Sequence, residues 1–323
     1  MKTKPVVTRT SNAKRATKSP TSYLAGKQCS AQVFKYLNAA LAENTLLAYR
    51  TDLNHFLAWG GTIPAKPERV ANYIAHFATL LAPSTLSRRL VAIAHAHVDR
   101  GLPSPTDSAL VRAMLRGVRR TCSRPLRQVA PLQKADLQKM VRGLTGLHGL
   151  RDAALLLLGF AGAFRRSELV SLDVNDVEFS EAGMLIRIRR SKTDQEGQGR
   201  LVAIPRVRGK CCPTRKLEEW LKVSGISNGA IFRRFNRYGQ LQPERLSAPS
   251  VALIVKHRTE ALGLDSTQFS GHSLRAGFAT NAAKKGASTA SIRGQTGHKS
   301  DAMVNRYIRN SQMFTDNPVR KIW

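Results

Sequence analysis

Acidic residues are scarce in this sequence. Of its 323 residues only 21 are Asp or Glu, against 52 Lys or Arg, so the formal net charge is +31. A solvated basic surface kept for solubility is a poor explanation, because solubility rarely requires so one-sided a charge. The imbalance indicates a polyanionic partner, with DNA or RNA favoured and an acidic membrane surface the weaker alternative.

Cysteines are also few, and none lies in a metal-binding pattern. The four are Cys29, Cys122, Cys211 and Cys212. The adjacent pair, Cys211 and Cys212, has neither a second pair nor a nearby His, so the spacing fits no zinc site. We interpret the four as reduced thiols of an intracellular protein.

Long apolar segments are absent. The most apolar run, Ala153 to Phe164, is too short to span a bilayer and is followed by Arg165 and Arg166. No apolar segment follows the basic N-terminal stretch, so we expect no secretory signal. These features predict a protein without a membrane partner, located in the cytoplasm and associated with the nucleoid.

The residues that are present favour a folded protein of two domains. Hydrophobic residues make up 42% of the chain, enough for a packed core. Residues 1–28 contain seven Lys or Arg and no acidic residue, which predicts a flexible basic arm that either touches DNA or is inert. We expect a helical domain over 29–121, a linker over 122–132 because it is basic and aperiodic, and a second domain over 133–323.

Hydrophobic periodicity predicts a mainly α fold with a small antiparallel β-sheet. Strands are expected at 184–189 and 201–204, joined by the polar hairpin loop 191–199. Pro67 is expected to open one helix and Ser84 to cap the next. The expected helices lie near 30–42, 44–59, 67–81, 84–100, 107–120, 134–144, 150–163, 213–223, 248–262, 272–285 and 300–309.

Several polar residues of the second domain suit phosphodiester chemistry. Arg165 closes a strongly apolar helix and stands three residues before Glu168. Its guanidinium can grip a phosphate through two hydrogen bonds, or it can simply pair with Glu168. His272 and Arg275 share a helix face and would bring a proton-transfer group beside a fixed cation; alone, such a pair is more often surface decoration.

Two further residues complete the candidate chemistry. Tyr307 follows Gly297 and His298, on a short helix that Ser300 can cap, and Arg306 lies beside it. It is either a half-buried tyrosine of an amphipathic helix or a phenol nucleophile in a cationic setting. Lys192, in the hairpin loop, is either solvated or a proton donor to a leaving oxygen.

The order of these residues resembles that of the tyrosine recombinase (phage integrase) family. The resemblance covers nearly the whole chain and includes the helical first half, as in Glu43–Thr45, Pro64–Glu68 and Gly101–Ser108. All six positions of the family pattern are filled with permitted residue types. In order, they are Arg165, Lys192, His272, Arg275, His298 and Tyr307.

The resemblance implies a mechanism. Tyr307 would attack a phosphorus and form a 3′-phosphotyrosyl link, while Arg165, Arg275 and His298 hold the non-bridging oxygens. Lys192 would protonate the leaving 5′-oxygen, His272 would assist proton transfer, and Glu168 would orient the site. The family pattern requires no metal, nucleotide or other cofactor, which agrees with the absence of a Gly-rich phosphate loop or carboxylate cluster.

The resemblance also implies how DNA is held. The helical core DNA-binding domain and the α+β catalytic domain would form a C-shaped clamp, with the helices beginning near Asn44 and Ser84 in the major groove. A homotetramer would act on double-stranded DNA with an inverted-repeat site, and the C-terminal segment would pack on a neighbouring subunit or on its own. The expected DNA contacts are Arg50, Ser84, Arg88, Arg89, Arg116, Arg119 and Arg120.

Three alternative functions are weaker explanations of the sequence. A type IB topoisomerase uses a similar set of residues and also forms a 3′-phosphotyrosyl link, but the resemblance of the helical half to the recombinase family argues against it. A catalytically silent DNA-binding protein would not require the filled set of catalytic positions. An RNA-binding or membrane-surface protein would account for the charge and leave the ordered motifs unexplained.

Overall fold

The chain forms two compact units, Met1–Leu126 and Arg127–Trp323. A computed structural model describes residues Gln32, Tyr36, 43–122, 129–189, 199–312 and 319–322, with side chains left out at 309–312, 320 and 321. The expected arm over 1–28, the expected helix over 30–42 apart from Gln32 and Tyr36, and Lys192 lie outside the described residues.

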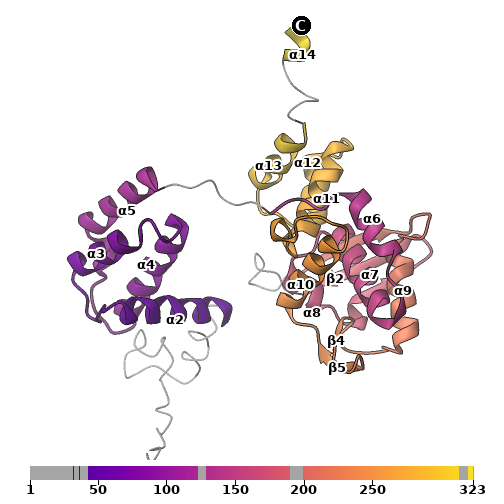
Figure 1. Ribbon diagram of the computed structural model, residues 1–323, viewed down its shortest axis with the longest axis horizontal. Helices are drawn as coiled ribbons and strands as arrows, with labels where there is room; N and C mark the ends of the chain where they lie inside the picture. Colours follow the sequence, from indigo (N-terminus) through magenta and orange to yellow (C-terminus); the bar gives the residue numbers. More distant parts are fainter. Residues whose placement is uncertain are drawn as a thin grey trace, which may run out of the picture. The chain divides into compact units, whose positions relative to one another are not determined.

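The first unit is helical (Figure 1). It contains α2 (Glu43–Ala58), α3 (Pro67–Phe77), α4 (Pro83–Val98), the 3₁₀ turn η2 (Pro105–Asp107) and α5 (Ala109–Thr121). Proline opens α3, as expected, but α4 begins at Pro83 and its N-cap is Ala82, so Ser84 does not cap it. The helices enclose Phe56, Tyr73, Ile74, Leu86 and Ile93, all fully buried.

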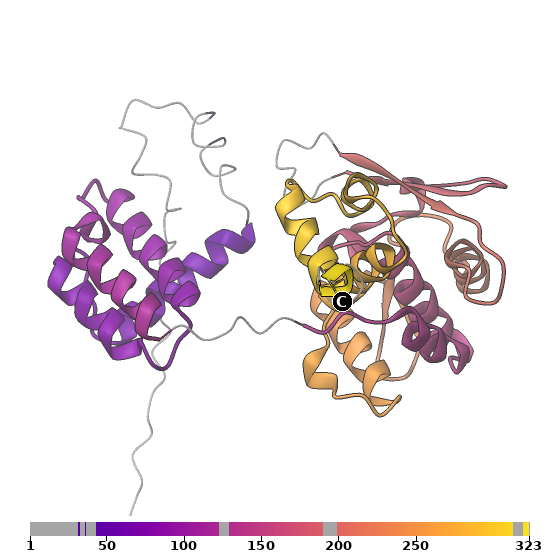
Figure 2. The ribbon, with the colours of Figure 1, turned by 90° about the horizontal axis from the view of Figure 1, so that it is seen from above.

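The second unit combines helices with two small antiparallel sheets, so the predicted fold class is confirmed (Figures 1 and 2). Its elements, in chain order, are α6 (Lys134–Arg142), α7 (Gly146–Ala161), α8 (Arg166–Ser171), η3 (Val174–Asp176), β1 (Val177–Phe179), β2 (Gly183–Ile188), β3 (Arg200–Pro205), α9 (Pro213–Ser224), β4 (Arg233–Phe235), β5 (Leu241–Arg245), α10 (Ala248–Glu260), η4 (Ser266–Gln268), α11 (His272–Lys284), α12 (Thr289–Thr296), α13 (Asp301–Gln312) and α14 (Val319–Ile322).

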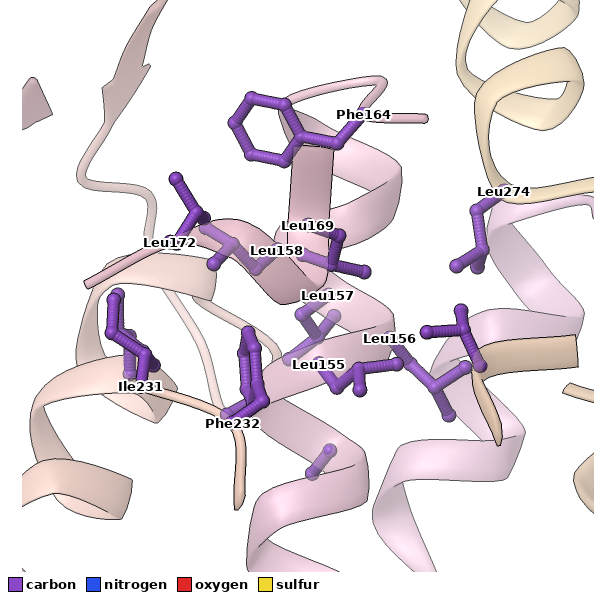
Figure 3. Packing of buried hydrophobic residues seen from close by; sticks show 14 of the residues in the cluster. Leu155, Leu156, Leu157, Leu158, Phe164, Leu169, Leu172, Ile231, Phe232 and Leu274 are labelled. Carbon is purple, nitrogen blue, oxygen red and sulfur yellow. The ribbon is translucent and has the colours of Figure 1, made fainter. Parts of the chain in front are cut away.

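The apolar run of α7 is the centre of the core. Leu155, Leu156 and Leu158 are fully buried, and Figure 3 shows them among side chains from neighbouring elements, including Phe232 and Leu274. Burial of each such side chain contributes about 1.5–3 kcal/mol. Among the described helices, none is long and apolar enough to cross a membrane.

The sheet directs one strand face into this core. In the β2–β3 pair, Met184 faces Ile204 and Ile186 faces Val202, and all four are buried. Side chains alternate along a strand with a period of two. Arg200, at the start of β3, is therefore in phase with the buried residues Val202 and Ile204 and points inward.

The last helices of the unit pack on one another. Ala279 and Ala283 of α11, Ile292 of α12 and Val304 of α13 form a small buried cluster against which Tyr307 is packed. Figures 1 and 2 show α11, α12 and α13 side by side. This packing holds Tyr307 near the start of α11 within one subunit.

Candidate active site

Arg165 and Glu168 are joined at the start of α8. We expected Arg165 to close the apolar helix, but α7 already ends at Ala161. Arg165 is instead the N-cap of α8. Its backbone N–H donates to Glu168 Oε2 (3.0 Å), and its Nη1 donates to Glu168 Oε1 (2.5 Å). The ion pair expected as the alternative is thus present, and it holds Arg165 in one orientation.

Arg275 is almost wholly buried, with 1% of its surface exposed. Its Nη1 donates to Ala163 O (2.8 Å) and to Thr296 O. Its Nη2 has no hydrogen-bond partner among the described residues. Buried donors are nearly always paired, so an open one is a candidate for binding a substrate oxygen. Burial is the main cause that lowers the pKa of Arg275 to about 10, with the charge of Arg165 next.

Ala163 holds Arg275 from a strained position. Its φ is +48°, and among the described non-glycine residues it alone has a positive φ. An L-residue in this region costs about 1–3 kcal/mol, and such strain occurs most often at functional sites. The strain directs the Ala163 carbonyl at the buried guanidinium of Arg275.

His272 and Tyr307 meet at the start of α11. The imidazole Nε2 lies 3.2 Å from the phenol oxygen, which is within reach for proton transfer. Burial, followed by the charges of Arg275 and Arg165, lowers the pKa of His272. Neutral His272 can therefore accept the phenol proton.

Tyr307 itself is held neutral in the DNA-free protein. Desolvation raises its pKa, and the positive charges of Arg275 and Arg306 oppose that increase. A phenol in this setting requires a base, or further positive charge, before it can act as a nucleophile.

His298 follows the left-handed Gly297, whose φ is +63°. Its Nδ1 lies 2.7 Å from Thr296 Oγ1, and 7% of its surface is exposed. Desolvation is the first cause that lowers the pKa of His298 to about 4, followed by the charges of Arg275, Arg165, His272 and Arg200. His298 is therefore neutral at pH 7 in the DNA-free protein.

The depressed pKa of His298 predicts an acid-sensitive fold. Because the unfolded chain binds this proton near pH 6.5 and the folded chain only near pH 4, the stabilisation is complete above pH 6.5 and is lost as pH falls toward 4. We expect His298→Gln to lose less thermal stability than the wild type over that window, measured by calorimetry. An exposed control, His257→Gln, should follow the wild-type curve; identical curves for all three proteins would contradict the assignment.

Sequence reasoning missed Arg200. Its Nη1 donates to Gln295 O (2.9 Å), and its Nη2 lies 3.4 Å from Glu168 Oε2. The signal was present in the sequence, because Arg200 is in phase with the apolar residues of its strand. Structure brings together five of the six predicted catalytic residues and Glu168; the sixth, Lys192, lies outside the described residues.

The predicted DNA contacts of the first unit divide into surface and interior residues. Arg89 turns inward, with its Nη1 donating to Tyr73 Oη (3.0 Å), and its side chain is 11% exposed. Because the Arg89 side chain is directed into the core, it is not proposed as a DNA contact, contrary to the expectation from sequence. The exposed members of the set are Arg50, Ser84, Arg88, Arg116, Arg119 and Arg120.

Asp52 fixes the exposed Arg88. This carboxylate is 2% exposed and accepts from Arg88 Nε (2.6 Å) and Nη2 (2.9 Å), with Arg89 Nε 3.7 Å away. We expect Asp52→Asn to lower the free energy of unfolding by about 1–3 kcal/mol, because two arginines lose their anion. Denaturant titration measures this. The exposed control Glu68→Gln should remain near the wild type, and equal midpoints for both variants would refute the role of Asp52.

The arrangement as a whole suits strand transfer at a phosphodiester. A buried guanidinium whose Nη2 has no partner among the described residues, a second guanidinium and a neutral imidazole meet at the end of α12, and Tyr307 contacts His272. Among the described residues, no group of three or more His, Cys, Asp or Glu is placed to hold a metal ion. These are the features that phosphoryl transfer to a tyrosine requires.

Comparison with known proteins identifies the family. Residues 131–313 match the phage integrase family. An integrase/recombinase XerD homologue of Selenomonas ruminantium is 40% identical over 298 residues, which covers 89% of this chain and 87% of the relative. The chain belongs to the phage integrase family of tyrosine recombinases. It is accordingly a site-specific DNA recombinase that breaks and rejoins DNA strands.

Other relatives agree over most of the chain. The recombinase Cre of Escherichia phage P1 is 27% identical over 278 residues, covering 80% of each protein. Among solved structures, XerH bound to palindromic difH substrate matches with a TM-score of 0.62 and 17% identity, over 91% of this chain and 84% of XerH. A lambda integrase dimer on a core site matches with a TM-score of 0.59 and 15% identity, over 86% and 75%.

Proposed function

We propose that Tyr307 is the nucleophile of this recombinase. Its Oη attacks the scissile phosphorus, the bond from phosphorus to the 5′-oxygen breaks, and a 3′-phosphotyrosyl link and a free 5′-hydroxyl result. His272 takes the phenol proton, since its Nε2 lies 3.2 Å from the phenol oxygen. A 5′-hydroxyl from the partner duplex then attacks the link, which releases Tyr307 and produces a Holliday junction after one pair of exchanges.

Arg165, Arg275 and His298 hold the two non-bridging oxygens, where negative charge grows in the transition state. The single observation that carries this assignment is the unpartnered Nη2 of the buried Arg275. Glu168 orients Arg165 and leaves the site with a net positive charge. Lys192 protonates the 5′-oxygen; this role rests on the resemblance of the hairpin sequence alone.

The DNA partner is a duplex with inverted repeats, bound by a homotetramer. The XerH structure contains a palindromic difH substrate, which supports the inverted repeat by similarity. We propose 29–121 as the core DNA-binding domain, 122–132 as the linker and 133–323 as the catalytic domain, and that the two domains clamp the duplex. Arg50, Ser84 and Arg88 would face the groove. Arg116, Arg119 and Arg120 would contact phosphates, which makes affinity fall steeply with salt.

The proposal is tested by selecting the bound site from random duplex DNA and nicking it near its centre to trap the cleaved state. A denaturing gel should show a protein–DNA adduct, and peptide mapping after nuclease digestion should place the nucleotide on Tyr307. Tight, selective binding without an adduct would instead indicate a DNA-binding protein without recombinase activity. An adduct mapped to another residue would refute Tyr307 as the nucleophile.

A further inference from the structure

We propose that Arg200 is a positioning residue of this active site: it fixes the C-terminal turn of α12, and with it the placement of His298. The inference rests on the proposed catalytic role of His298 and Arg165. Arg200 lies outside the six-residue family pattern of Arg165, Lys192, His272, Arg275, His298 and Tyr307, and it acts through other residues.

Three successive carbonyls at the end of α12 each accept a hydrogen bond from a different arginine. The three arginines come from β3, from α11 and from the N-cap of α8. The pairs are Arg200 Nη1 with Gln295 O (2.9 Å), Arg275 Nη1 with Thr296 O, and Arg165 Nη2 with Gly297 O (3.4 Å). Arg200 thus supplies the first of three cationic contacts to one turn.

Such contacts suit the end of a helix. The last carbonyls of a helix have no partner within it, and they carry the negative end of the helix dipole. Here α12 ends at Thr296, and Gly297 turns the chain so that His298 enters the site. The three arginines satisfy these carbonyls and so define where His298 stands.

Arg200 also contacts Glu168 of α8. Its Nη2 pairs with Glu168 Oε2 at 3.4 Å, and the same carboxylate pairs with Arg165. One guanidinium thus joins α12 to Glu168, which orients Arg165. The side chain is packed tightly: a Cβ on Gly297 would lie 2.8 Å from Arg200 Nε.

The charge of Arg200 reaches His298 as well. Arg200 is among the cations that lower the pKa of His298, after Arg275 and Arg165, and His272 contributes too. The Tyr307 ring also neighbours His298, with 6.0 Å between the ring centroids. Removing Arg200 takes away one cation and opens the site to water, so both effects raise the pKa of His298.

The test compares wild type with R200Q and R200K on the selected, nicked site. We expect R200Q to bind DNA within about threefold of wild type, because Nη1 and Nη2 of Arg200 are engaged by Gln295 O and Glu168 within the unit, and to cleave up to about 10²-fold more slowly, because the phosphate-holding groups are misplaced. R200K should be intermediate, since one ammonium cannot reach both Gln295 O and Glu168. The matched control R206Q removes another Arg–Glu pair at the far end of β3 and should cleave normally.

A second measurement does not depend on cleavage. NMR titration of the DNA-free protein should show a higher pKa for His298 in R200Q than in wild type, and no change in R206Q. Normal cleavage by R200Q, or an unchanged His298 pKa, would overturn the role of Arg200. If R200Q fails to fold, the cleavage rate of R200K tests the proposal instead. Cleavage by R200K at the full wild-type rate would show that the simultaneous contact of Arg200 with Gln295 O and Glu168 is not required. If wild type itself forms no adduct, the proposed function fails, while the titration still decides on Arg200.

Discussion

Replacing Tyr307 with phenylalanine will abolish the covalent protein–DNA adduct and leave binding to the selected site within a few-fold of wild type. Phe keeps the ring that packs beside Val304 and Ala279, so the fold and the DNA-binding surface remain. It lacks the oxygen that forms the bond to phosphorus. Because no neighbouring group can replace a covalent nucleophile in the same position, the expected loss is complete rather than partial.

The measurement combines a gel-shift titration with the nicked-substrate assay. Tyr238→Phe is the matched control: Tyr238 is exposed, and its hydroxyl accepts from the neighbouring Arg237 (2.6 Å). It should form the adduct at the wild-type rate. Substantial adduct from Tyr307→Phe would move the nucleophile to another residue, whereas loss of both binding and adduct would indicate a folding defect, which thermal unfolding would reveal.

The sequence alone predicts the chemistry of the site better than its geometry. The order and spacing of residue types, which resemble the tyrosine recombinase pattern, predict the set of Arg165, His272, Arg275, His298 and Tyr307, although no single motif is decisive. It cannot predict that Arg275 is buried with one open nitrogen. That property depends on the carbonyls of Ala163 and Thr296, which carry no side-chain signal.

The elements missed from sequence have weak patterns. Helix α12 (Thr289–Thr296) buries only Ile292 and Thr296, too few residues to display a helical period, and α8 spans six residues. The inward turn of Arg89 was also missed, because its partners Tyr73 and His55 come from other helices. Helices of the longer, periodic segments and the β2–β3 hairpin strands appear close to their expected positions.

Replacing Arg275 with lysine will slow cleavage by about 10²–10³-fold, the usual cost of losing one preorganised donor to a developing oxyanion. The Nη1 of Arg275 donates to Ala163 O and Thr296 O, whereas Nη2 has no partner in the part of the chain that the structure describes. A lysine has one ammonium group and cannot satisfy the two carbonyls and reach a phosphate oxygen in the fixed fork of a guanidinium. DNA binding should change little, because most phosphate contacts lie elsewhere.

Single-turnover cleavage at saturating protein measures the effect. The matched control is Arg258→Lys: Arg258 Nη2 pairs with Asp152 at 2.6 Å within the same unit. This control should lower stability without slowing cleavage. Equal cleavage rates for the two lysine variants would refute a direct role for Arg275.

A neutral substrate separates the two ways in which Arg275 can act. If its open nitrogen binds a charged non-bridging oxygen, a methylphosphonate at the scissile position removes the charge that Arg275 stabilises. The ratio of the wild-type cleavage rate to that of Arg275→Lys should then shrink by at least tenfold. If Arg275 acts only by holding the Ala163 and Thr296 carbonyls, the methylphosphonate slows cleavage by both proteins equally. The ratio of their cleavage rates then stays the same. The charge on the phosphate thus decides whether the unpartnered nitrogen is the group that binds it.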